Sequence, residues 1–229
     1  MAAVAARELA DGEVVFVGIG LPNLACNLAR RTHAPNLVLI YESGAIGATP
    51  SRLPVSIGDP ALVTGSLMVC GMADVFQLFL QNGRIEVGFL GGAQVDRYAN
   101  INTTVIGDYA KPKVRLPGSG GAAEIALHAQ RVLIVSKLSP RAFPERVDFV
   151  TSSGQRVTRV ITDKGILERD AGTGELVLAA LYPGVDVTDL QVGWKLRSSA
   201  HIARVDPPTP VELQLLRDVL DPQRLYLTS

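Results

Sequence analysis

The stretch LVLIYESGAIG, residues 37–47, places a single carboxylate, Glu42, directly after a run of apolar residues. A glutamate is ionised at neutral pH, so it can attack an activated carbonyl without a partner base. Most of the residues that follow add almost no side-chain bulk, so a reacting group can approach the carboxylate closely; they are Ser43, Gly44, Ala45, Gly47 and Ala48. Glu42 is therefore a candidate nucleophile for acyl transfer. A helix cap, a surface charge or a salt-bridge partner remains the alternative role.

A glycine turn lies shortly before this stretch. The segment GIGLPN holds Gly18 and Gly20, the first two glycines of a dinucleotide-binding fingerprint. Pro22 and Asn23 interrupt that pattern, and the final glycine is missing. Glu42 stands where a ribose-binding acid would follow, so a nicotinamide- or flavin-binding domain stays open as an alternative.

A second glycine turn, PGSGG, contains Gly118, Ser119, Gly120 and Gly121 immediately before a predicted helix. Consecutive backbone N–H groups at a helix start suit a phosphate or a developing negative oxygen. The sequence therefore predicts an oxyanion-binding turn here, with a plain tight turn as the alternative.

Other reactive residues form no recognisable constellation. His33, His128 and His201 stand apart from any serine, cysteine or metal-binding pattern. Cys26 and Cys70 lie in apolar segments at no metal-ligand spacing, which indicates two free thiols in a reducing cytoplasm. No metal site is predicted, and the nucleophile-elbow, zinc-protease and P-loop motifs are missing from the sequence.

Strands and helices must alternate to position these groups. Continuous apolar runs predict buried strands at 13–18, 36–41, 85–90 and 131–136. Helical spacing predicts helices at 1–13, 22–33, 72–84, 119–130 and 209–222. Residues 43–66 and 91–118 read as irregular segments, and 146–150, 159–170 and 175–183 as short antiparallel strands.

This order predicts one α/β domain over residues 1–229. Its expected core is a three-layer, open, mostly parallel sheet flanked by helices, with a smaller antiparallel C-terminal portion. Ligands bind such sheets at the carboxyl ends of the strands, where Glu42 and the glycine turns fall.

Composition excludes several classes of partner. The 22 basic and 22 acidic residues balance and form no basic stripe, so nucleic acid binding is not expected. No apolar run is long enough to span a membrane, although 47% of the residues are hydrophobic. The N-terminus lacks the features of a signal peptide, and a cytoplasmic protein is expected.

Several motifs in the right order resemble the β subunit of class I coenzyme A transferases, closest to the glutaconate CoA-transferase type. They are GIGLPN, YESGAIG, GGAQVDRYANINTT, GDYAKPKVRLPGSGGA, ITDKGIL, LYPGV and DPQRLYL, and they cover essentially the whole chain. The resemblance implies that Glu42 attacks an acyl-CoA thioester, forms an anhydride and then carries CoA as a thioester. It also implies coenzyme A as co-substrate, no permanently bound cofactor, and a homologous α subunit that completes the active site.

The resemblance and the strand-end positions together yield a set of candidate site residues. The expected catalytic groups are the Glu42 carboxylate and the backbone amides of Gly120 and Gly121. The expected substrate- and CoA-binding residues are Gly18, Gly20, Ser43, Gly44, Gly91, Gly92, Ala93, Gln94, Asn102, Gly118 and Ser119. For the polar residues among them, hydrogen bonding within the loop is the alternative.

Three alternative functions remain open at this point. A CoA-thioester hydrolase or decarboxylase on the same scaffold would dispense with transfer, although retention of Glu42 in ESG favours transfer. A nucleotide-binding domain would bind NAD or FAD independently of Glu42. A sugar-phosphate sensor or isomerase domain would need basic residues at the strand ends, where they are sparse.

Overall fold

The computed structural model describes residues 1–227 and divides the chain into two compact units. The first contains Met1–Phe89, His128–Gln130 and the segment from Pro208 onward, and the second contains Leu90–Leu127 and Arg131–Pro207. The prediction of a single domain over 1–229 stays a prediction, and its residues 228 and 229 lie outside the described part.

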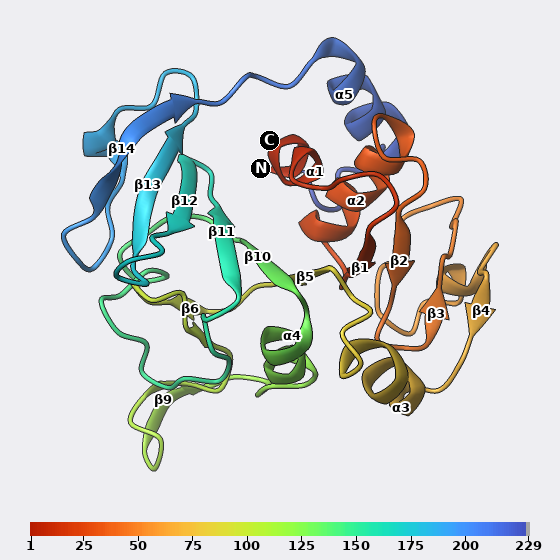
Figure 1. The fold of residues 1–229 in the computed structure, drawn as a ribbon, viewed down its shortest axis with the longest axis horizontal. Coiled ribbons are helices and arrows are strands. Elements are labelled where there is room, and N and C mark those ends of the chain that lie inside the picture. The colour runs from red at the N-terminus through yellow and green to blue at the C-terminus, as the bar shows by residue number, and fades with distance from the viewer. Residues whose placement is uncertain (228–229) are drawn as a thin grey trace. The chain divides into compact units, whose positions relative to one another are not determined.

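The first unit is an open sheet in the strand order β5-β1-β2-β3-β4, covered by helices (Figure 1). Its elements are α1 (Ala2–Arg7), β1 (Val14–Phe16), α2 (Leu21–Arg31), β2 (Val38–Ile40), β3 (Ala45–Ile46), η1 (Pro60–Val63), β4 (Met68–Val69), α3 (Met72–Asp74), η2 (Val75–Leu80), β5 (Val87–Leu90), α5 (Pro210–Gln214) and η4 (Leu215–Leu220).

Strands β5, β1 and β2 run parallel, and their side chains are almost entirely buried because helices cover them. Helix α2 packs on α1, and η4 returns to contact α2. A short ion pair from Arg7 of α1 to Glu212 of α5, 2.6 Å between nitrogen and oxygen, joins the two ends of the chain within this unit.

Local sequence explains where these helices begin. Pro22 stands in the first turn of α2, where a missing backbone N–H costs nothing. Thr209 caps α5 by accepting a hydrogen bond from the Glu212 N–H, and Pro210 follows at the first helical position. These predicted caps are confirmed.

The second unit carries the strands β10-β11-β12-β13-β14 in that order, plus two short hairpins. Its elements are β6 (Gln94–Val95), β7 (Ile101–Asn102), β8 (Val105–Gly107), β9 (Pro112–Arg115), α4 (Ala122–His128), β10 (Arg131–Val135), β11 (Val157–Ile161), β12 (Gly165–Arg169), β13 (Leu176–Leu181), η3 (Val187–Asp189) and β14 (Arg197–Arg204).

Strands β11, β12 and β13 pair antiparallel, while β10 pairs parallel with β11 and β14 parallel with β13. The predicted fold class, an open, mostly parallel α/β sheet with a smaller antiparallel C-terminal portion, is confirmed.

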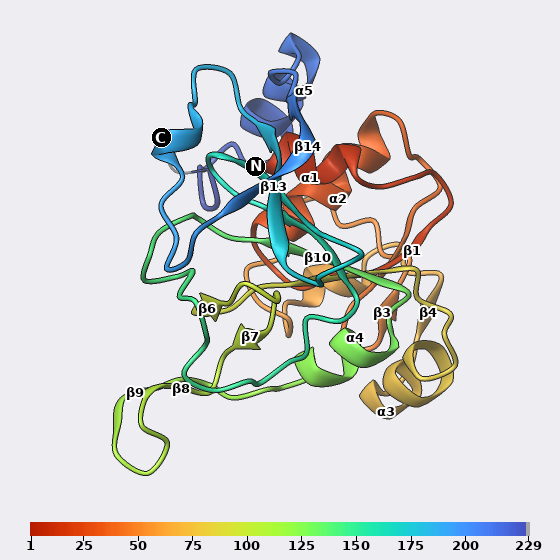
Figure 2. The same ribbon diagram turned by 60° about the vertical axis from the view of Figure 1, so that its left-hand side comes forward.

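Three local predictions need correction. Residues 43–66 are not irregular throughout, because the chain turns back on β2 immediately after Glu42 and forms β3. Residues 91–118 hold two β-hairpins, β6–β7 and β8–β9, and the second projects from its unit (Figure 2). Residues 146–150 form no strand, because their backbone follows an irregular path stabilised by side-chain hydrogen bonds.

Candidate active site

Glu42 lies at the tip of a tight turn that joins β2 to β3. The Gly44 N–H donates to the Tyr41 carbonyl at 2.9 Å, and the Tyr41 N–H donates to the Ala45 carbonyl at 3.0 Å. Glu42 and Ser43 are the two central residues of the turn, so their side chains cannot continue the sheet. Glu42 is half-buried and Ser43 is exposed. The carboxylate is therefore presented at the carboxyl end of β2, as predicted.

Gly44 is required by this turn in two ways. Its φ of 104° lies in the region that disfavours other residues. A Cβ at this position would also overlap the carbonyl oxygen of Cys70. The close approach lets the Cys70 N–H donate to the Gly44 carbonyl at 3.0 Å. The turn is thus fastened to the residue that follows β4.

A buried polar network lies beside the turn. Asn23 of α2 donates from Nδ2 to the Tyr41 hydroxyl at 2.9 Å and to the Gly18 carbonyl at 3.3 Å. Asn27, one helical turn later, donates to the Asn23 Oδ1 at 2.8 Å. Burial raises the pKa of Tyr41 to about 12, so the phenol stays neutral. The network ties the glycine turn after β1 to the residue immediately before Glu42.

The Glu42 carboxylate makes no hydrogen bond or ion pair with any other residue among 1–227. Its neighbours Ala45 and Ala48 are small and buried. In the same unit, Asp59 accepts hydrogen bonds from Arg52 at 2.7 and 2.9 Å and from two backbone N–H groups. The Arg52 hydrogen bonds hold the pKa of Asp59 well below its usual range. The oxygens of Glu42, in contrast, are left available to a substrate.

The GSGG turn belongs to the second unit and precedes α4. The Gly118 N–H donates to the Thr103 carbonyl at 2.8 Å, and the Thr103 hydroxyl donates to the Gly118 carbonyl at 2.7 Å. The Ala122 N–H donates to the Ser119 carbonyl at 3.0 Å. The φ values of Gly118 and Gly120, 97° and 48°, favour glycine at both positions. The amides of Gly120 and Gly121 remain the candidates for oxyanion binding.

The GGAQ segment is organised by contacts within the second unit. A Cβ on Gly92 would overlap Ile101, whereas Gly91 and Ala93 are exposed. Gln94 is buried and accepts from the Asn102 side chain at 2.7 Å and from the Asp148 N–H at 3.1 Å. These hydrogen bonds favour a structural role for the two amides.

Asn102 is fully buried, and its side chain also hydrogen-bonds to the backbone of Val105 in β8 and to the backbone N–H of Thr104. Contact of Gln94 or Asn102 with substrate stays a prediction. Gly91 and Ala93 are the residues of this segment that offer surface to a ligand.

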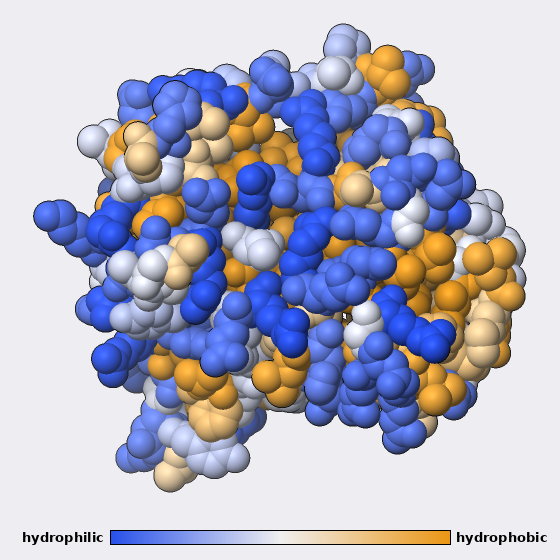
Figure 3. Space-filling model, viewed as in Figure 1, coloured by the Kyte–Doolittle hydropathy of each residue, from blue (hydrophilic) through white to orange (hydrophobic). Residues whose placement is uncertain are grey.

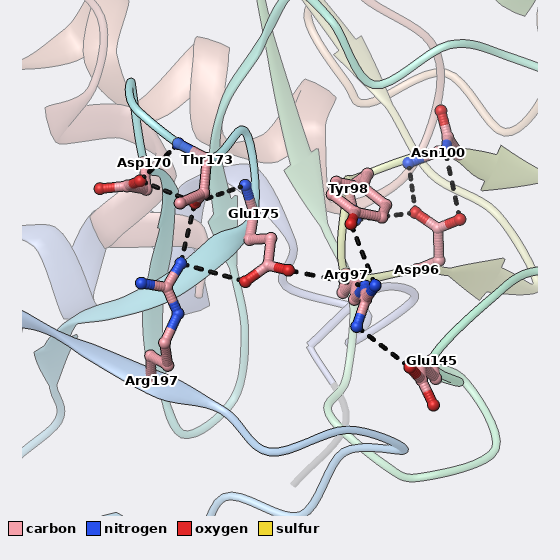
Figure 4. Close-up of polar contacts among 9 residues, drawn as sticks. All are labelled: Asp96, Arg97, Tyr98, Asn100, Glu145, Asp170, Thr173, Glu175 and Arg197. Atoms are coloured by element: carbon pink, nitrogen blue, oxygen red, sulfur yellow. Dashed lines mark hydrogen bonds and ion pairs between the residues drawn. The ribbon is translucent and has the colours of Figure 1, made fainter.

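A charged network orders the loop that follows β6 (Figure 4). Arg97 lies 3.0 Å from Glu145 and 3.7 Å from Glu175, and Arg197 of β14 lies 3.0 Å from Glu175. Asp96 accepts hydrogen bonds from two backbone N–H groups and from the Asn100 side chain. Every carboxylate in this network has a partner, so it explains why the loop is ordered and supplies no free nucleophile.

Two residues of this buried network are not predicted from the sequence. In the sequence, Asn23 stands out only as a break in a dinucleotide fingerprint, and Tyr41 only as the end of an apolar run. The signal is the pair of asparagines at 23 and 27, which lie on one helix face and are fully or almost fully buried. Buried asparagines need partners, and the tyrosine hydroxyl is one of them.

Residues 1–193 match the family model described as coenzyme A transferase. The chain belongs to the coenzyme A transferase family. One subunit of the 3-oxoadipate CoA-transferase of Pseudomonas knackmussii is 49% identical over 234 residues, which cover 95% of this chain and 90% of that protein. The crystal structure of glutaconate coenzyme A-transferase from Acidaminococcus fermentans superposes with a TM-score of 0.93 at 32% identity, covering 100% of this chain and 95% of that one.

The decarboxylase AibA/AibB has the same fold, with a TM-score of 0.89 at 27% identity over 98% of this chain and 94% of its own. The family and the CoA-transferase class predicted from the sequence are confirmed, and coenzyme A is the co-substrate of the family. Within residues 1–227, no helix is long and apolar enough to cross a membrane. The same residues contain no group of histidines, cysteines and carboxylates that could hold a metal ion.

Proposed function

We propose that this chain is the β subunit of an acyl-CoA:carboxylate CoA-transferase in which Glu42 is the nucleophile. The observation that carries the proposal is the half-buried Glu42 carboxylate, which has no partner among residues 1–227 and stands at the tip of a turn. A carboxylate in a structural role would normally be hydrogen-bonded or ion-paired, as Asp59 is.

The proposed reaction proceeds by four acyl transfers. A Glu42 oxygen attacks the thioester carbonyl of the donor and expels CoA thiolate, which forms a mixed anhydride. The thiolate then attacks the glutamyl carbonyl of that anhydride and releases the donor acid, leaving a glutamyl-CoA thioester. The acceptor carboxylate attacks this thioester and forms a second anhydride, and CoA thiolate attacks its acyl carbonyl. The products are the new acyl-CoA and the free Glu42 carboxylate.

Attack by a stabilised carboxylate on a thioester is uphill, so the oxyanion must be stabilised. We assign that task to the Gly120 and Gly121 amides, and one such donor contributes about 3 to 4 kcal/mol. The distal parts of CoA supply binding energy that offsets the remaining cost. The small residues Ser43, Gly44 and Ala45 that follow Glu42 let the substrate approach it closely, which keeps water from hydrolysing the anhydride.

The substrate that we propose is a short dicarboxylic acid carried as its CoA thioester. Two relatives support this choice, since one is named for 3-oxoadipate and the other for glutaconate, and both acids carry two carboxylates. Because the 3-oxoadipate relative shares more identity with this chain than the glutaconate relative does, 3-oxoadipate is the first substrate to test.

A second, homologous α subunit completes the proposed enzyme, because the relatives are named as one subunit of each enzyme. We expect the purified single chain to transfer no CoA. Coenzyme A acts as co-substrate, with no permanently bound cofactor. Two unpaired thiols, Cys26 and Cys70, are consistent with a cytoplasmic enzyme.

The test is chemical trapping on the complete complex. The complex is incubated with the CoA thioester of 3-oxoadipate and then treated with hydroxylamine or borohydride. Peptide mass spectrometry should find the hydroxamate or the reduced alcohol on Glu42. Glu168→Gln, which removes a partly exposed glutamate from β12, is the matched control and should leave the adduct unchanged.

A complex that turns over the thioester without ever modifying Glu42 would contradict the nucleophile. In that case, release of free acid and CoA would indicate a hydrolase, and release of carbon dioxide a decarboxylase like AibA/AibB. Binding of NAD or FAD with no effect of Glu42→Ala would instead support a nucleotide-binding domain.

A further inference from the structure

The GSGG turn has little packing to hold it in place. Residues 108–124, which run from the β8–β9 hairpin through the turn, include no buried residue. Figure 3 shows the hairpin projecting at the lower left, with hydrophilic and hydrophobic side chains mixed on its surface. A Cβ on Gly118 or Gly120 would meet no neighbouring atom within 4 Å, so the space beside the turn is open. A loop with so few buried contacts depends on hydrogen bonds to stay in one place.

One residue supplies every hydrogen bond that joins the turn to a distant segment. Within the described part of the chain, residues 118–121 bond either to the adjacent residues 122–125 or to Thr103. The contact with Thr103 is reciprocal, because Gly118 donates to the Thr103 carbonyl and accepts from the Thr103 hydroxyl. Thr103 therefore fixes both the N–H and the carbonyl of the first residue of the turn.

The Thr103 hydroxyl is needed because the Thr103 backbone N–H is used elsewhere. In a regular antiparallel pair, two facing residues exchange both of their backbone hydrogen bonds. The Thr103 N–H instead donates to the Thr151 hydroxyl at 2.9 Å. The Thr103 hydroxyl replaces it as the donor to the Gly118 carbonyl. The Thr151 hydroxyl is itself held by a hydrogen bond of 2.7 Å with the Thr104 hydroxyl.

The same segment also holds the GGAQ segment. The Ala93 N–H donates to the carbonyl of Asn102, the residue before Thr103, at 3.0 Å. The Asn102 side chain donates to the Gln94 Oε1 at 2.7 Å. Residues 102–104 therefore join the two glycine-rich segments of the second unit, and loss of a bond at Thr103 would let the GSGG turn move relative to GGAQ.

The two amides assigned to the oxyanion have no other partner. Neither the Gly120 N–H nor the Gly121 N–H donates to any residue among 1–227. Their direction is set by the backbone at Gly118 and Gly120, where both φ values are positive and glycine has wide conformational freedom. A donor is effective only at about 2.7 to 3.1 Å from the developing oxygen. A turn released at Gly118 would lose that alignment.

We propose that Thr103 is a positioning residue whose hydroxyl holds the GSGG turn so that the Gly120 and Gly121 amides point at the developing oxyanion. It acts through the Gly118 carbonyl, and Thr151 fixes Thr103 in turn. This inference rests on the proposed function, which assigns the oxyanion to those two amides. The oxyanion develops only in the transition state, so a displaced turn lowers kcat and leaves the binding of acyl-CoA unchanged.

The experiment measures kcat and KM of the complete complex with the CoA thioester of 3-oxoadipate and isotopically labelled 3-oxoadipate as the acceptor. Thr103→Val keeps the shape of the side chain but removes the hydroxyl, so kcat should fall about tenfold or more while KM changes less than about twofold. Thr103→Ser keeps the hydroxyl and should retain kcat within about threefold. Thr151→Val removes the acceptor of the Thr103 N–H and should lower kcat about threefold or more.

Thr162→Val is the matched control. The buried Thr162 hydroxyl donates to the Gly165 carbonyl at 2.8 Å in the turn between β11 and β12, so the same kind of bond is lost from another turn of the second unit. The melting temperature of the complex should fall by about 2 to 4 °C in Thr103→Val and by at least as much in Thr162→Val. The kcat of Thr162→Val should stay within about twofold of wild type.

Three results would overturn the proposal. A kcat within twofold of wild type in both Thr103→Val and Thr151→Val would show that the turn needs neither hydroxyl. Equal losses in Thr103→Val and Thr103→Ser would assign the effect to packing of the methyl group. An equal loss in Thr162→Val would assign it to stability alone. If Thr103→Val does not fold, Thr151→Val and Thr103→Ser decide the question by the same criteria.

The two proposals can fail separately. If the wild-type complex labels Glu42 and Thr103→Val labels it at the same rate, the nucleophile stands and the positioning role of Thr103 falls. If the wild-type complex never labels Glu42, but Thr103→Val slows cleavage of the thioester and Thr103→Ser restores it, the positioning role stands and the transferase mechanism falls.

Discussion

The Glu42 turn and the charged network around Arg97 show two ways of ordering a loop. The turn is positioned by neutral groups: the buried amide of Asn23, the buried phenol of Tyr41 and the backbone carbonyl of Gly18. The loop after β6 is ordered by ion pairs among partly exposed side chains, with Glu175 lying between Arg97 and Arg197. The first unit therefore orders its turn without using the carboxylate in it, whereas the second uses its carboxylates to order the loop.

The difference has a chemical consequence. A carboxylate held by arginine is stabilised as a charge and loses lone pairs to hydrogen bonds, which makes it a poorer nucleophile. Neutral hydrogen bonds through Asn23 and Tyr41 fix the backbone at Glu42 and leave its oxygens unoccupied. The same comparison predicts which substitutions abolish CoA transfer, which displace the Glu42 turn and which affect only an exposed ion pair.

Glu42→Gln should have the largest effect on activity. The amide keeps the size of the side chain but cannot form an anhydride, so we expect CoA transfer to fall by at least about 10³-fold. The free energy of unfolding should change by less than about 0.5 kcal/mol, because the carboxylate has no partner to lose among residues 1–227. Steady-state kinetics and urea unfolding measure the two quantities, and a large loss of stability would mean that Glu42 is structural.

Gly44→Ala should disturb both fold and activity. The left-handed backbone costs about 1 to 2 kcal/mol with a side chain present, and overlap with the Cys70 carbonyl adds to that cost. We expect a destabilisation of about 3 kcal/mol or more and an activity loss on the order of 10²-fold from misplacement of Glu42. The matched control is Gly12→Ala, where φ is 84° but no atom lies within 4 Å.

Thermal unfolding separates the two contributions. Gly12→Ala should lose only the backbone term, about 1 to 2 kcal/mol, and keep its activity. Equal losses at positions 12 and 44 would show that the contact between the turn and Cys70 contributes nothing.

Asn23→Ala and Tyr41→Phe test the neutral network. Asn23→Ala leaves the buried Tyr41 hydroxyl without its donor and opens a small cavity, so we expect a loss of about 2 to 3 kcal/mol. Tyr41→Phe removes the hydroxyl but leaves Asn23 bonded to the Gly18 carbonyl, so a loss of about 1 kcal/mol is expected. If the network positions Glu42, kcat should fall about tenfold in Asn23→Ala with little change in KM.

A double variant reports whether the two side chains act together. The combined loss should be smaller than the sum of the single losses by about 1 kcal/mol, because both changes break the same hydrogen bond. Additive losses, with kcat unchanged throughout, would show that the network stabilises the unit without positioning the turn.

The alternation of strands and helices is predictable because its signals are local. Continuous apolar runs around Val15, Leu39 and Leu133 predict buried strands, and Pro22 and Thr209 predict helix starts. The position of Glu42 at a strand end follows from the same pattern. The return of the chain through β3 is not predictable, because it depends on Gly44 adopting a positive φ against Cys70, a residue distant in the sequence.

Part of the site is equally hidden from sequence. The hydrogen bonds that join Gln94 to Asn102 and to Asp148 depend on a hairpin and on a loop far along the chain. A polar cluster is visible in GGAQVDRYANINTT, but residue types alone do not separate ligand contacts from loop contacts. The sequence also does not predict that the Glu42 carboxylate lacks a hydrogen-bond or ion-pair partner in the described part of the chain. Such a partner can lie far along the sequence, and residue types alone do not show which residues meet.

Arg197→Ala, which tests the charged network, should have the smallest effect of these substitutions. The guanidinium lies 3.0 Å from Glu175 and 2.8 Å from the Thr173 hydroxyl, but about half of the Arg197 side chain is exposed. Exposed pairs of this kind contribute up to about 1 kcal/mol, and salt screens them. We therefore expect a loss of less than about 1 kcal/mol that shrinks further at about 0.5 M salt, with CoA transfer unchanged. If Arg197→Ala lowered kcat as much as Asn23→Ala did, the charged network would also act on the chemistry, and the division between the two regions would be wrong.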